Sequence, residues 1–112
     1  MNRAIKILEK VMDICAYRQK ILASNIANAD TPGYKARDIN FQDELKRAIE
    51  NDTENNYKVI EASTTMPNRD GNTVNIELEM TKVAETMLMY NTATQLISTR
   101  IRMLKDAIKG GR

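Results

Sequence analysis

The stretch Ser24-Asn25-Ile26-Ala27-Asn28-Ala29-Asp30-Thr31-Pro32-Gly33-Tyr34-Lys35 ends one long helical pattern and begins everything that separates it from a second. Small residues at positions 23, 24, 27 and 29 leave little bulk, so another backbone can approach closely. Asn25 and Asn28 are three residues apart and share one helical face, where their amides both donate and accept hydrogen bonds.

Pro32 and Gly33 predict how this helix stops. Pro32 has no N–H and pushes Thr31 towards an extended conformation, which ends a helix. The pair then occupies the two central positions of a turn. Because the second of these positions requires positive φ in a type II turn, a Gly at that place favours this turn. Pro-Gly alone is an ordinary helix end; the whole stretch is more specific.

The pattern before the turn predicts a helix over residues 4–29. Its apolar positions alternate at spacings of three and four, as in a heptad seam, with one polar interruption at Gln19. A second row, which includes Ile14 and Ile21, repeats every seven residues and widens the apolar face to nearly half the circumference. This helix is therefore predicted to have more than one neighbour. The seam comprises Ile5, Leu8, Met12, Cys15, Gln19, Leu22, Ile26 and Ala29.

A second helix of the same design is predicted over residues 74–109. Glu77 and Glu79 near its start, and Lys105 and Lys109 near its end, suit the helix dipole. The two apolar rows consist of a seam, Met80, Val83, Met87, Tyr90, Thr94, Ile97, Ile101, Leu104 and Ile108, and an extra row, Met89, Leu96 and Met103.

The middle of the chain, residues 30–73, is predicted to be short and irregular. Asn40 is a candidate N-cap with Asp43 three residues on, followed by a short amphipathic helix. Residues 57–62 carry β-type residues in partial alternation and predict a short strand. The remaining predictions are an extended segment over 34–39, a mobile polar loop over 50–56 and a loop over 63–72.

The amino-acid composition excludes several classes of functional site. The 112 residues suit one modest domain, and a balanced net charge of +2 with scattered basic residues does not demand nucleic acid. One Cys and no His rule out an intrachain disulfide, a Cys-based zinc site and the commonest acid–base residue. No apolar run is long enough for a signal peptide or a membrane span, so the bare sequence looks cytosolic.

No catalytic constellation, metal site or cofactor site is found, and the chain is predicted not to be an enzyme. The carboxylates Asp13, Asp43, Glu44 and Glu85 are interpreted as solvated surface. Cys15 lies at a seam position and is interpreted as a small buried hydrophobe. The wide apolar faces leave two alternatives: a self-contained helical hairpin, or a hairpin whose leftover rows are covered by the middle segment or by other chains.

The sequence also resembles a known family. Asn25-Ile26-Ala27-Asn28, then Thr31, Gly33 and Tyr34, match the N-terminal signature of bacterial flagellar axial proteins. Asp70-Gly71-Asn72-Thr73-Val74, a Glu-rich helix start and the closing segment from Leu104 to Gly110 look like the FlgB family of proximal rod subunits. The resemblance implies an all-α fold in which the terminal helices pair as an antiparallel coiled coil and pack with neighbours around a central channel.

As function, the resemblance implies a structural subunit of the flagellar basal-body rod, homo-oligomeric once assembled. It would link the membrane ring and export apparatus to the distal rod and help to transmit torque. Its partners would be other rod subunits, the rod–ring junction protein and the membrane-ring protein. It would leave the cell by type III export without a cleaved signal and lie in the periplasmic rod. The residues expected to pack between subunits are Asn25, Asn28, Thr31, Pro32, Gly33, Tyr34, Ile14, Ile21, Leu96, Ile101 and Met103.

Two other functions compete with this one. A soluble helical adaptor or export chaperone would use the apolar faces to bind a client helix, but such a protein need not carry the Asn-x-x-Asn…Thr-Pro-Gly-Tyr string. The second alternative, a small basic dimer that binds nucleic acid, is supported only by the sequence pI of about 8.7.

Overall fold

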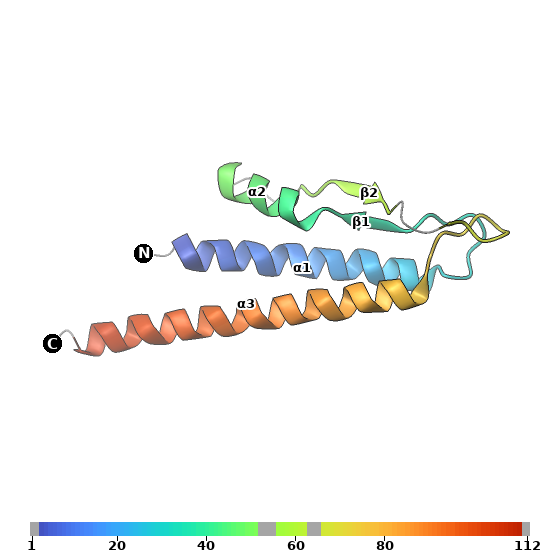
Figure 1. The fold of residues 1–112 in the computed structure, drawn as a ribbon. Coiled ribbons are helices and arrows are strands. Elements are labelled where there is room, and N and C mark those ends of the chain that lie inside the picture. The colour runs from blue at the N-terminus through green and yellow to red at the C-terminus, as the bar shows by residue number, and fades with distance from the viewer. Residues whose placement is uncertain (1–2, 52–55, 63–65, 111–112) are drawn as a thin grey trace.

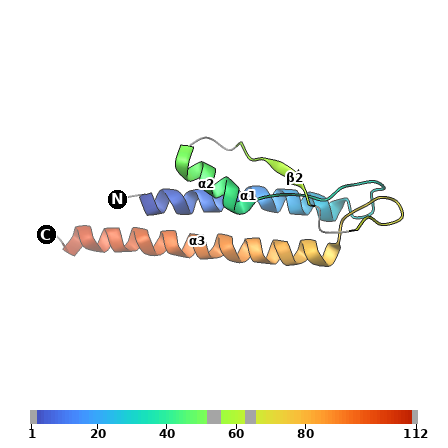
Figure 2. The ribbon, with the colours of Figure 1, turned by 45° about the horizontal axis from the view of Figure 1, so that its top comes forward.

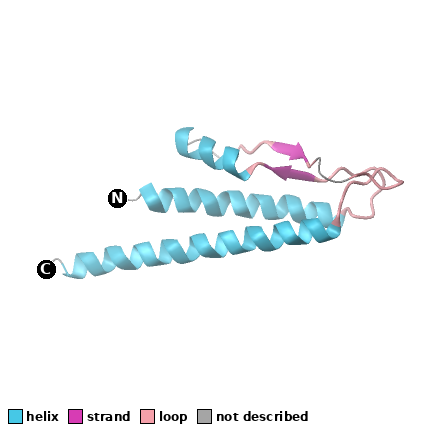
Figure 3. Ribbon diagram, in the orientation of Figure 1, coloured by secondary structure: helices cyan, strands magenta, loops and turns pink. Residues whose placement is uncertain are grey.

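The computed structural model describes residues 3–51, 56–62 and 66–110. Within these residues, three helices and two short strands follow one another (Figures 1 and 3). The elements are α1 (Arg3–Ala27), β1 (Arg37–Ile39), α2 (Phe41–Asn51), β2 (Val59–Glu61) and α3 (Ile76–Gly110). The molecule is elongated and measures 69 × 27 × 17 Å.

Helix α1 lies in the middle of the structure, with α3 along one side and the segment from β1 to β2 along the other (Figure 1). The two long helices run antiparallel, which confirms the predicted pairing of the terminal helices. In both ribbon views the C-terminal end of α3 reaches beyond the N-terminal end of α1 (Figures 1 and 2). We call this projecting end of α3, residues 102–110, the overhang.

Both long helices have bounds within a few residues of those predicted. Helix α1 ends at Ala27 rather than at residue 29, because the N–H of Ala29 bonds the carbonyl of Ile26 in a tighter, three-residue turn. Helix α3 starts at Ile76 rather than at residue 74. Asn75 caps it, since its Oδ1 accepts a hydrogen bond of 3.2 Å from the N–H of Leu78.

The turn after α1 has the predicted form. The N–H of Tyr34 donates to the carbonyl of Thr31 at 3.2 Å, which closes a turn with Pro32 and Gly33 at its centre. Gly33 has a φ of 74°, in the left-handed region that the predicted turn requires.

The middle segment also forms its predicted elements. Asn40 caps α2, with its Oδ1 accepting from the N–H of Asp43 at 3.1 Å. Strands β1 and β2 pair antiparallel, with Arg37 opposite Glu61. The polar loop predicted over residues 50–56 is shorter at its start, because α2 continues to Asn51; its residues 52–55 lie outside the described residues, as do residues 63–65 of the second predicted loop.

The apolar core lies between α1 and the middle segment. Ile14 and Ile21 of α1 pack with Ile39 of β1, and all three side chains are buried. Tyr17 and Tyr57 close one side with ring centroids 4.7 Å apart. The partly buried side chains around this cluster are Tyr17, Phe41, Leu45, Tyr57 and Val59. The second apolar row of α1 is thus covered by the chain's own middle segment.

The face that α3 turns towards α1 differs from the predicted seam. Glu79, Thr86 and Ala93, spaced seven residues apart, are its buried residues. Of the predicted seam, Val83, Ile97 and Leu104 are half-buried. The other seam residues are exposed: Met80, Met87, Tyr90, Thr94, Ile101 and Ile108. The prediction that the whole seam is buried against α1 is therefore wrong.

Polar groups on α1 explain the difference. Arg18 and Asn25 project from α1 towards α3, and a buried polar group needs a hydrogen-bond partner. Thr86 and Glu79 provide such partners, which a methionine side chain does not. Ala93 continues the same line of α3 with a small side chain that allows close helix packing.

Candidate functional site

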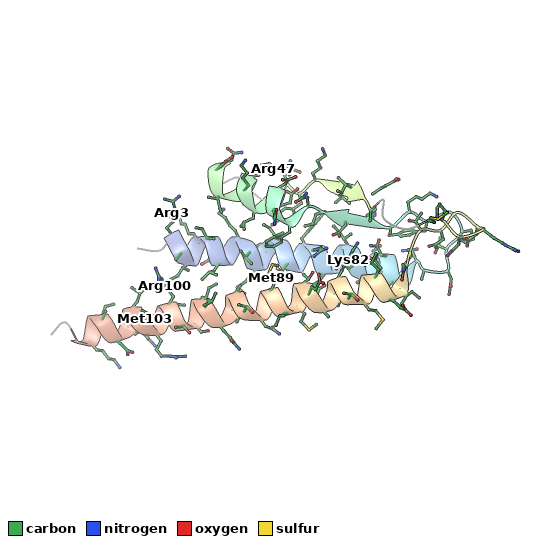
Figure 4. The ribbon with its side chains drawn as sticks, viewed as in Figure 1. Arg3, Arg47, Lys82, Met89, Arg100 and Met103 are labelled. Carbon is green, nitrogen blue, oxygen red and sulfur yellow. The ribbon has the colours of Figure 1, made fainter. Side chains whose placement is uncertain are left out.

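A cluster of polar side chains joins α1, β1 and α3, and we call it the polar joint: Arg18, Asn25, Asp38, Glu79, Lys82 and Thr86. Arg18 donates a hydrogen bond to each oxygen of the Asp38 carboxylate, from Nε at 2.8 Å and from Nη2 at 2.9 Å. Its third nitrogen, Nη1, donates to Oγ1 of Thr86 at 3.1 Å. Lys82, labelled in Figure 4, adds a second positive charge. Its Nζ lies 3.4 Å from Oδ2 of Asp38. One guanidinium therefore ties three elements together.

The other half of the polar joint centres on Asn25, which is fully buried. Its Nδ2 donates to the Arg37 carbonyl at 2.7 Å and to Oε1 of Glu79 at 2.6 Å. Its Oδ1 accepts from the N–H of Arg37 at 3.0 Å and from the hydroxyl of Tyr34 at 3.2 Å. The side-chain amide thus uses both donors and both acceptor positions to hold the turn, β1 and α3.

The electrostatics of the polar joint favour its charged form. Burial alone would raise the pKa of the Asp38 carboxyl. The hydrogen bonds from Arg18 and from the N–H of Ile39, with the charges of Arg18 and Lys82, outweigh that effect and hold the pKa below its ordinary value. The hydrogen bond to Asp38 in turn raises the pKa of Arg18.

These shifts predict acid sensitivity. A carboxyl whose folded-state pKa is depressed adds stability above its unfolded pKa, about 3.9, and loses it as pH falls through the folded pKa. We expect the free energy of unfolding to fall below about pH 4. Asp38→Asn should remove part of that dependence and cost about 3 kcal/mol at neutral pH, since Arg18 is left without its partner. Urea unfolding across pH tests this. Asp106→Asn, an exposed control on α3, should change neutral-pH stability little, and equal losses in both variants would contradict the prediction.

Asn72 holds the end of the hairpin, and we call its contacts the turn lock. The side chain is almost fully buried, and its Nδ2 lies within 2.8–3.0 Å of three carbonyl oxygens, those of Asn28, Ala29 and Thr31. Its Oδ1 accepts from the N–H of Val74 at 2.7 Å. One amide therefore binds three carbonyls of the turn that follows α1 and holds the segment that leads into α3 beside them.

The exposed large apolar side chains of α3 include two strips, one on each side of α1; Ile76, Leu88, Tyr90 and Ile108 are exposed as well. Successive residues of a helix turn by about 100°. Residues one position after the buried line therefore lie on one flank, and residues three positions after it lie on the opposite flank. We call these strips flank A (Met80, Met87 and Ile101) and flank B (Met89, Leu96 and Met103). Each of the six side chains is between 39 and 60 % exposed.

The structure places the residues predicted to pack between subunits in two groups. Leu96, Ile101 and Met103 are exposed on the flanks. Ile14 and Ile21 lie inside the chain's own core, so their surfaces are already covered by the middle segment.

The residues around the turn make contacts within the chain. Asn25 belongs to the polar joint, and Nδ2 of Asn28 bonds the Ser24 carbonyl at 2.8 Å. Oγ1 of Thr31 donates to Oδ1 of Asn28 at 3.0 Å, whereas Pro32 and Gly33 are exposed. A role of these residues between subunits stays a prediction.

Sequence reasoning missed several residues of the site. The sequence assigns no role to Arg18, places Glu79 only at a helix start and includes Asn72 only in the family resemblance. The prediction that Asp38 is exposed is wrong, because the side chain is buried against Arg18. Glu44 was interpreted as solvated and is instead buried, where it accepts hydrogen bonds from Arg47 and from the N–H of Lys58. The seven-residue spacing of Arg18 and Asn25, matched by that of Glu79 and Thr86, is the one sequence signal that could have indicated two paired polar lines.

Cys15 is buried as predicted, and burial raises the pKa of its thiol more than the nearby Arg18 charge lowers it. Among the described residues, no group of His, Cys, Asp or Glu is arranged to hold a metal ion. None of the helices in the described ranges combines the length and apolar character needed to cross a bilayer.

Comparison with known proteins places this architecture in a family. A family model described as flagella basal body rod protein matches residues 16–35, which include Arg18, Asn25 and the turn. The flagellar basal body rod protein FlgB of Salmonella typhimurium is 31% identical to this chain over an alignment of 133 positions, gaps included. The alignment covers 99% of this chain and 96% of that protein. FlgB of Bacillus subtilis is 30% identical over 96% of this chain and 95% of its own length, and FlgB of Cereibacter sphaeroides is 40% identical over 83% and 84%. The chain belongs to the flagellar basal body rod protein FlgB family.

Proposed function

We propose that this chain, a structural subunit of the flagellar basal-body rod, packs against its neighbours through flanks A and B of α3. The observation that supports the proposal is the unequal covering of the two long helices. The second apolar row of α1 is buried by the middle segment, whereas the described part of the chain leaves both flanks of α3 open. Exposed apolar strips of this kind mark sites of protein association.

The two flanks favour an open assembly over a closed dimer. Flank A carries Met80, Met87 and Ile101, and flank B carries Met89, Leu96 and Met103, so the two surfaces are not the same. A contact between different surfaces repeats from subunit to subunit and generates a ring or a helical array. A rod subunit needs such a repeating contact, and a helix with an apolar strip on each side of its partner provides it.

The finer assignments are also part of this proposal. The subunit lies in the proximal, periplasmic rod, between the membrane ring with its export apparatus and the distal rod, and it transmits torque as a mechanical part. It contacts the rod–ring junction protein and the membrane-ring protein, and it has no enzymatic activity. Export without a cleaved signal follows from the same assignment.

Charged substitutions on α3 test the proposal. Leu96→Glu should leave the helicity and export of the subunit unchanged, because Leu96 is half exposed in the single chain. In the rod, it would bury an unpaired charge that costs several kcal/mol and should abolish rod formation. Ile97→Glu, on the half-buried face towards α1, should instead lower helicity in the isolated subunit. The measurements are circular dichroism of purified variants and recovery of basal bodies from cells.

The neighbouring residue provides a matched control. Gln95 is exposed and lies about 100° from Leu96 on the helix, away from both flanks. Gln95→Glu introduces the same charge and should support motility. Motile cells with Leu96→Glu would place flank B in solvent within the rod, and the assignment of the flanks to subunit packing would fail.

A further inference from the structure

The exposed charges of α3 are separated by sign along its length. Over residues 76–99 the exposed charged side chains are Glu77 and Glu85, both acidic, since Glu79 and Lys82 belong to the polar joint. From residue 100 onwards the exposed charges are Arg100, Arg102, Lys105 and Lys109, against Asp106 alone. The helix therefore has an acidic first part and a basic end.

The helix dipole explains only part of this separation. It favours acidic residues in the first turn and basic residues in the last, and it fades within one turn. Glu77 and Lys109 lie in those turns, but Glu85, Arg100 and Arg102 do not. The ion pairs within the described part of the chain involve other cations, and Arg102 does not pair with Asp106 four residues on. The basic end therefore carries positive charge that the fold itself does not neutralise.

The basic end is also the part of α3 that projects past α1. The contacts Asn25–Glu79, Arg18–Thr86 and Met12–Thr94 place the start of α1 opposite the region near Ile101. Figure 4 shows Arg100 and Met103 at that end of the molecule, where Arg3 of α1 also lies. Beyond it, the overhang presents Ile108 with 74% of its surface exposed. Apolar and basic side chains thus extend together beyond the hairpin.

We infer that the overhang binds the acidic first part of α3 in a second copy of this chain, with the two α3 helices parallel and shifted along their axes. The inference rests on the proposed assembly through α3. Glu77 and Arg100, like Glu85 and Lys109, are separated by 23 or 24 residues. The apolar set Met80, Val83 and Met87 recurs 21 residues later as Ile101, Leu104 and Ile108. Both repeats correspond to a shift of about 32–36 Å at 1.5 Å per residue.

An antiparallel pair of α3 helices would also bring opposite charges together. Such a pair buries the same flank of both copies against itself and closes at two subunits. The parallel, shifted arrangement joins the start of flank A in one copy to the end of flank A in the next copy, so it continues from copy to copy and leaves flank B free for a further contact. The repeating contact that a rod subunit needs therefore favours the parallel arrangement.

Charge reversal tests the inference. The start variant carries Glu77→Lys and Glu85→Lys, and the end variant carries Arg102→Glu, Lys105→Glu and Lys109→Glu. Either variant alone places like charges at every contact and should reduce basal-body recovery by about tenfold or more in cells without the unsubstituted gene. When both variants are co-expressed, the basic start of the start variant can bind the acidic end of the end variant. The basic end of the start variant can bind the acidic start of the end variant, so basal-body recovery should be restored. The control, Lys46→Glu with Glu50→Lys on α2, should assemble normally.

The size of the assembled species gives the arrangement. A concentrated mixture of the two purified variants should sediment as species larger than dimers, whereas each variant alone should remain monomeric. A mixture that stops at heterodimers would overturn the parallel arrangement. Normal assembly of each single variant, or failure of the mixture, would overturn the charge contact. If these variants assemble normally while Leu96→Glu does not, the proposed function stands and only this inference falls.

Discussion

Asn25→Asp should destabilise the isolated chain by about 3–5 kcal/mol, the largest effect that we expect from a change of so few atoms. The substitution removes the two N–H donors that now bond the Arg37 carbonyl and Glu79. It also places a carboxylate where the present contact with Oε1 of Glu79 measures 2.6 Å, in a site closed to water. Since small domains are stable by only about 5–15 kcal/mol, this variant should be partly unfolded at ambient temperature. Urea unfolding followed by circular dichroism measures the loss.

A second substitution separates the local charge effect from general damage. Adding Glu79→Gln to Asn25→Asp removes the like-charge contact and supplies a new amide donor, so part of the lost stability should return. Asn91→Asp makes the same chemical change at an exposed position of α3 and should have little effect. If Asn25→Asp unfolds at the same urea concentration as the unsubstituted chain, the polar joint does not hold the helices together.

The second large effect is expected at Asn72. Asn72→Ala leaves the carbonyls of Asn28, Ala29 and Thr31 without their side-chain donor and frees the N–H of Val74. The carbonyls of Asn28 and Thr31 keep their backbone donors, the N–H groups of Thr31 and Tyr34. The Ala29 carbonyl and the Val74 N–H lose the partner that Asn72 provides. Orphaned buried polar groups cost about 1–3 kcal/mol each where water does not replace the lost partner, so we expect a total loss of about 2–4 kcal/mol. Thermal unfolding of the purified chain measures it.

Asn72→Asp provides a sharper comparison than alanine. It keeps the oxygen that accepts from Val74 but sets a negative charge against three carbonyl oxygens. At neutral pH it should therefore be less stable than Asn72→Ala, although it retains more of the original side chain. Asn68→Ala is the control, because the exposed Asn68 contacts Asn72 through backbone atoms. An order of stability with aspartate above alanine would mean that the three carbonyls reach another donor.

Much of the fold followed from local sequence patterns. Helix periodicity, the Pro32–Gly33 turn, the Asn40 cap and the strand in residues 57–62 all depend on neighbouring residues, and the structure confirms them. Periodicity also showed that each long helix has a face too wide for a single neighbour. It did not show what covers that face. The middle segment covers Ile14 and Ile21, and this contact joins residues far apart in the sequence.

The candidate site was less predictable for a related reason. Glu79, Thr86 and Ala93 repeat every seven residues, but a polar or small line on a helix is typical of a solvent-facing side. Glu79 and Thr86 are buried only because Asn25 and Arg18 on α1 form hydrogen bonds with them. Asn72 likewise gains its role from carbonyls more than forty residues away in the chain. Such contacts depend on the tertiary structure, which local rules do not contain.

The polar joint also solves an ambiguity that any pair of heptad-patterned helices faces. Apolar rows look the same after a slide of one heptad, so they do not fix the register of the pair. Asn25 and Arg18 are seven residues apart, as are Glu79 and Thr86. A slide by one heptad in one direction would leave Glu79 without its amide donor, and a slide in the other would carry Asn25 past the start of α3. Only one register satisfies both pairs, and that register also determines how far α3 projects beyond α1.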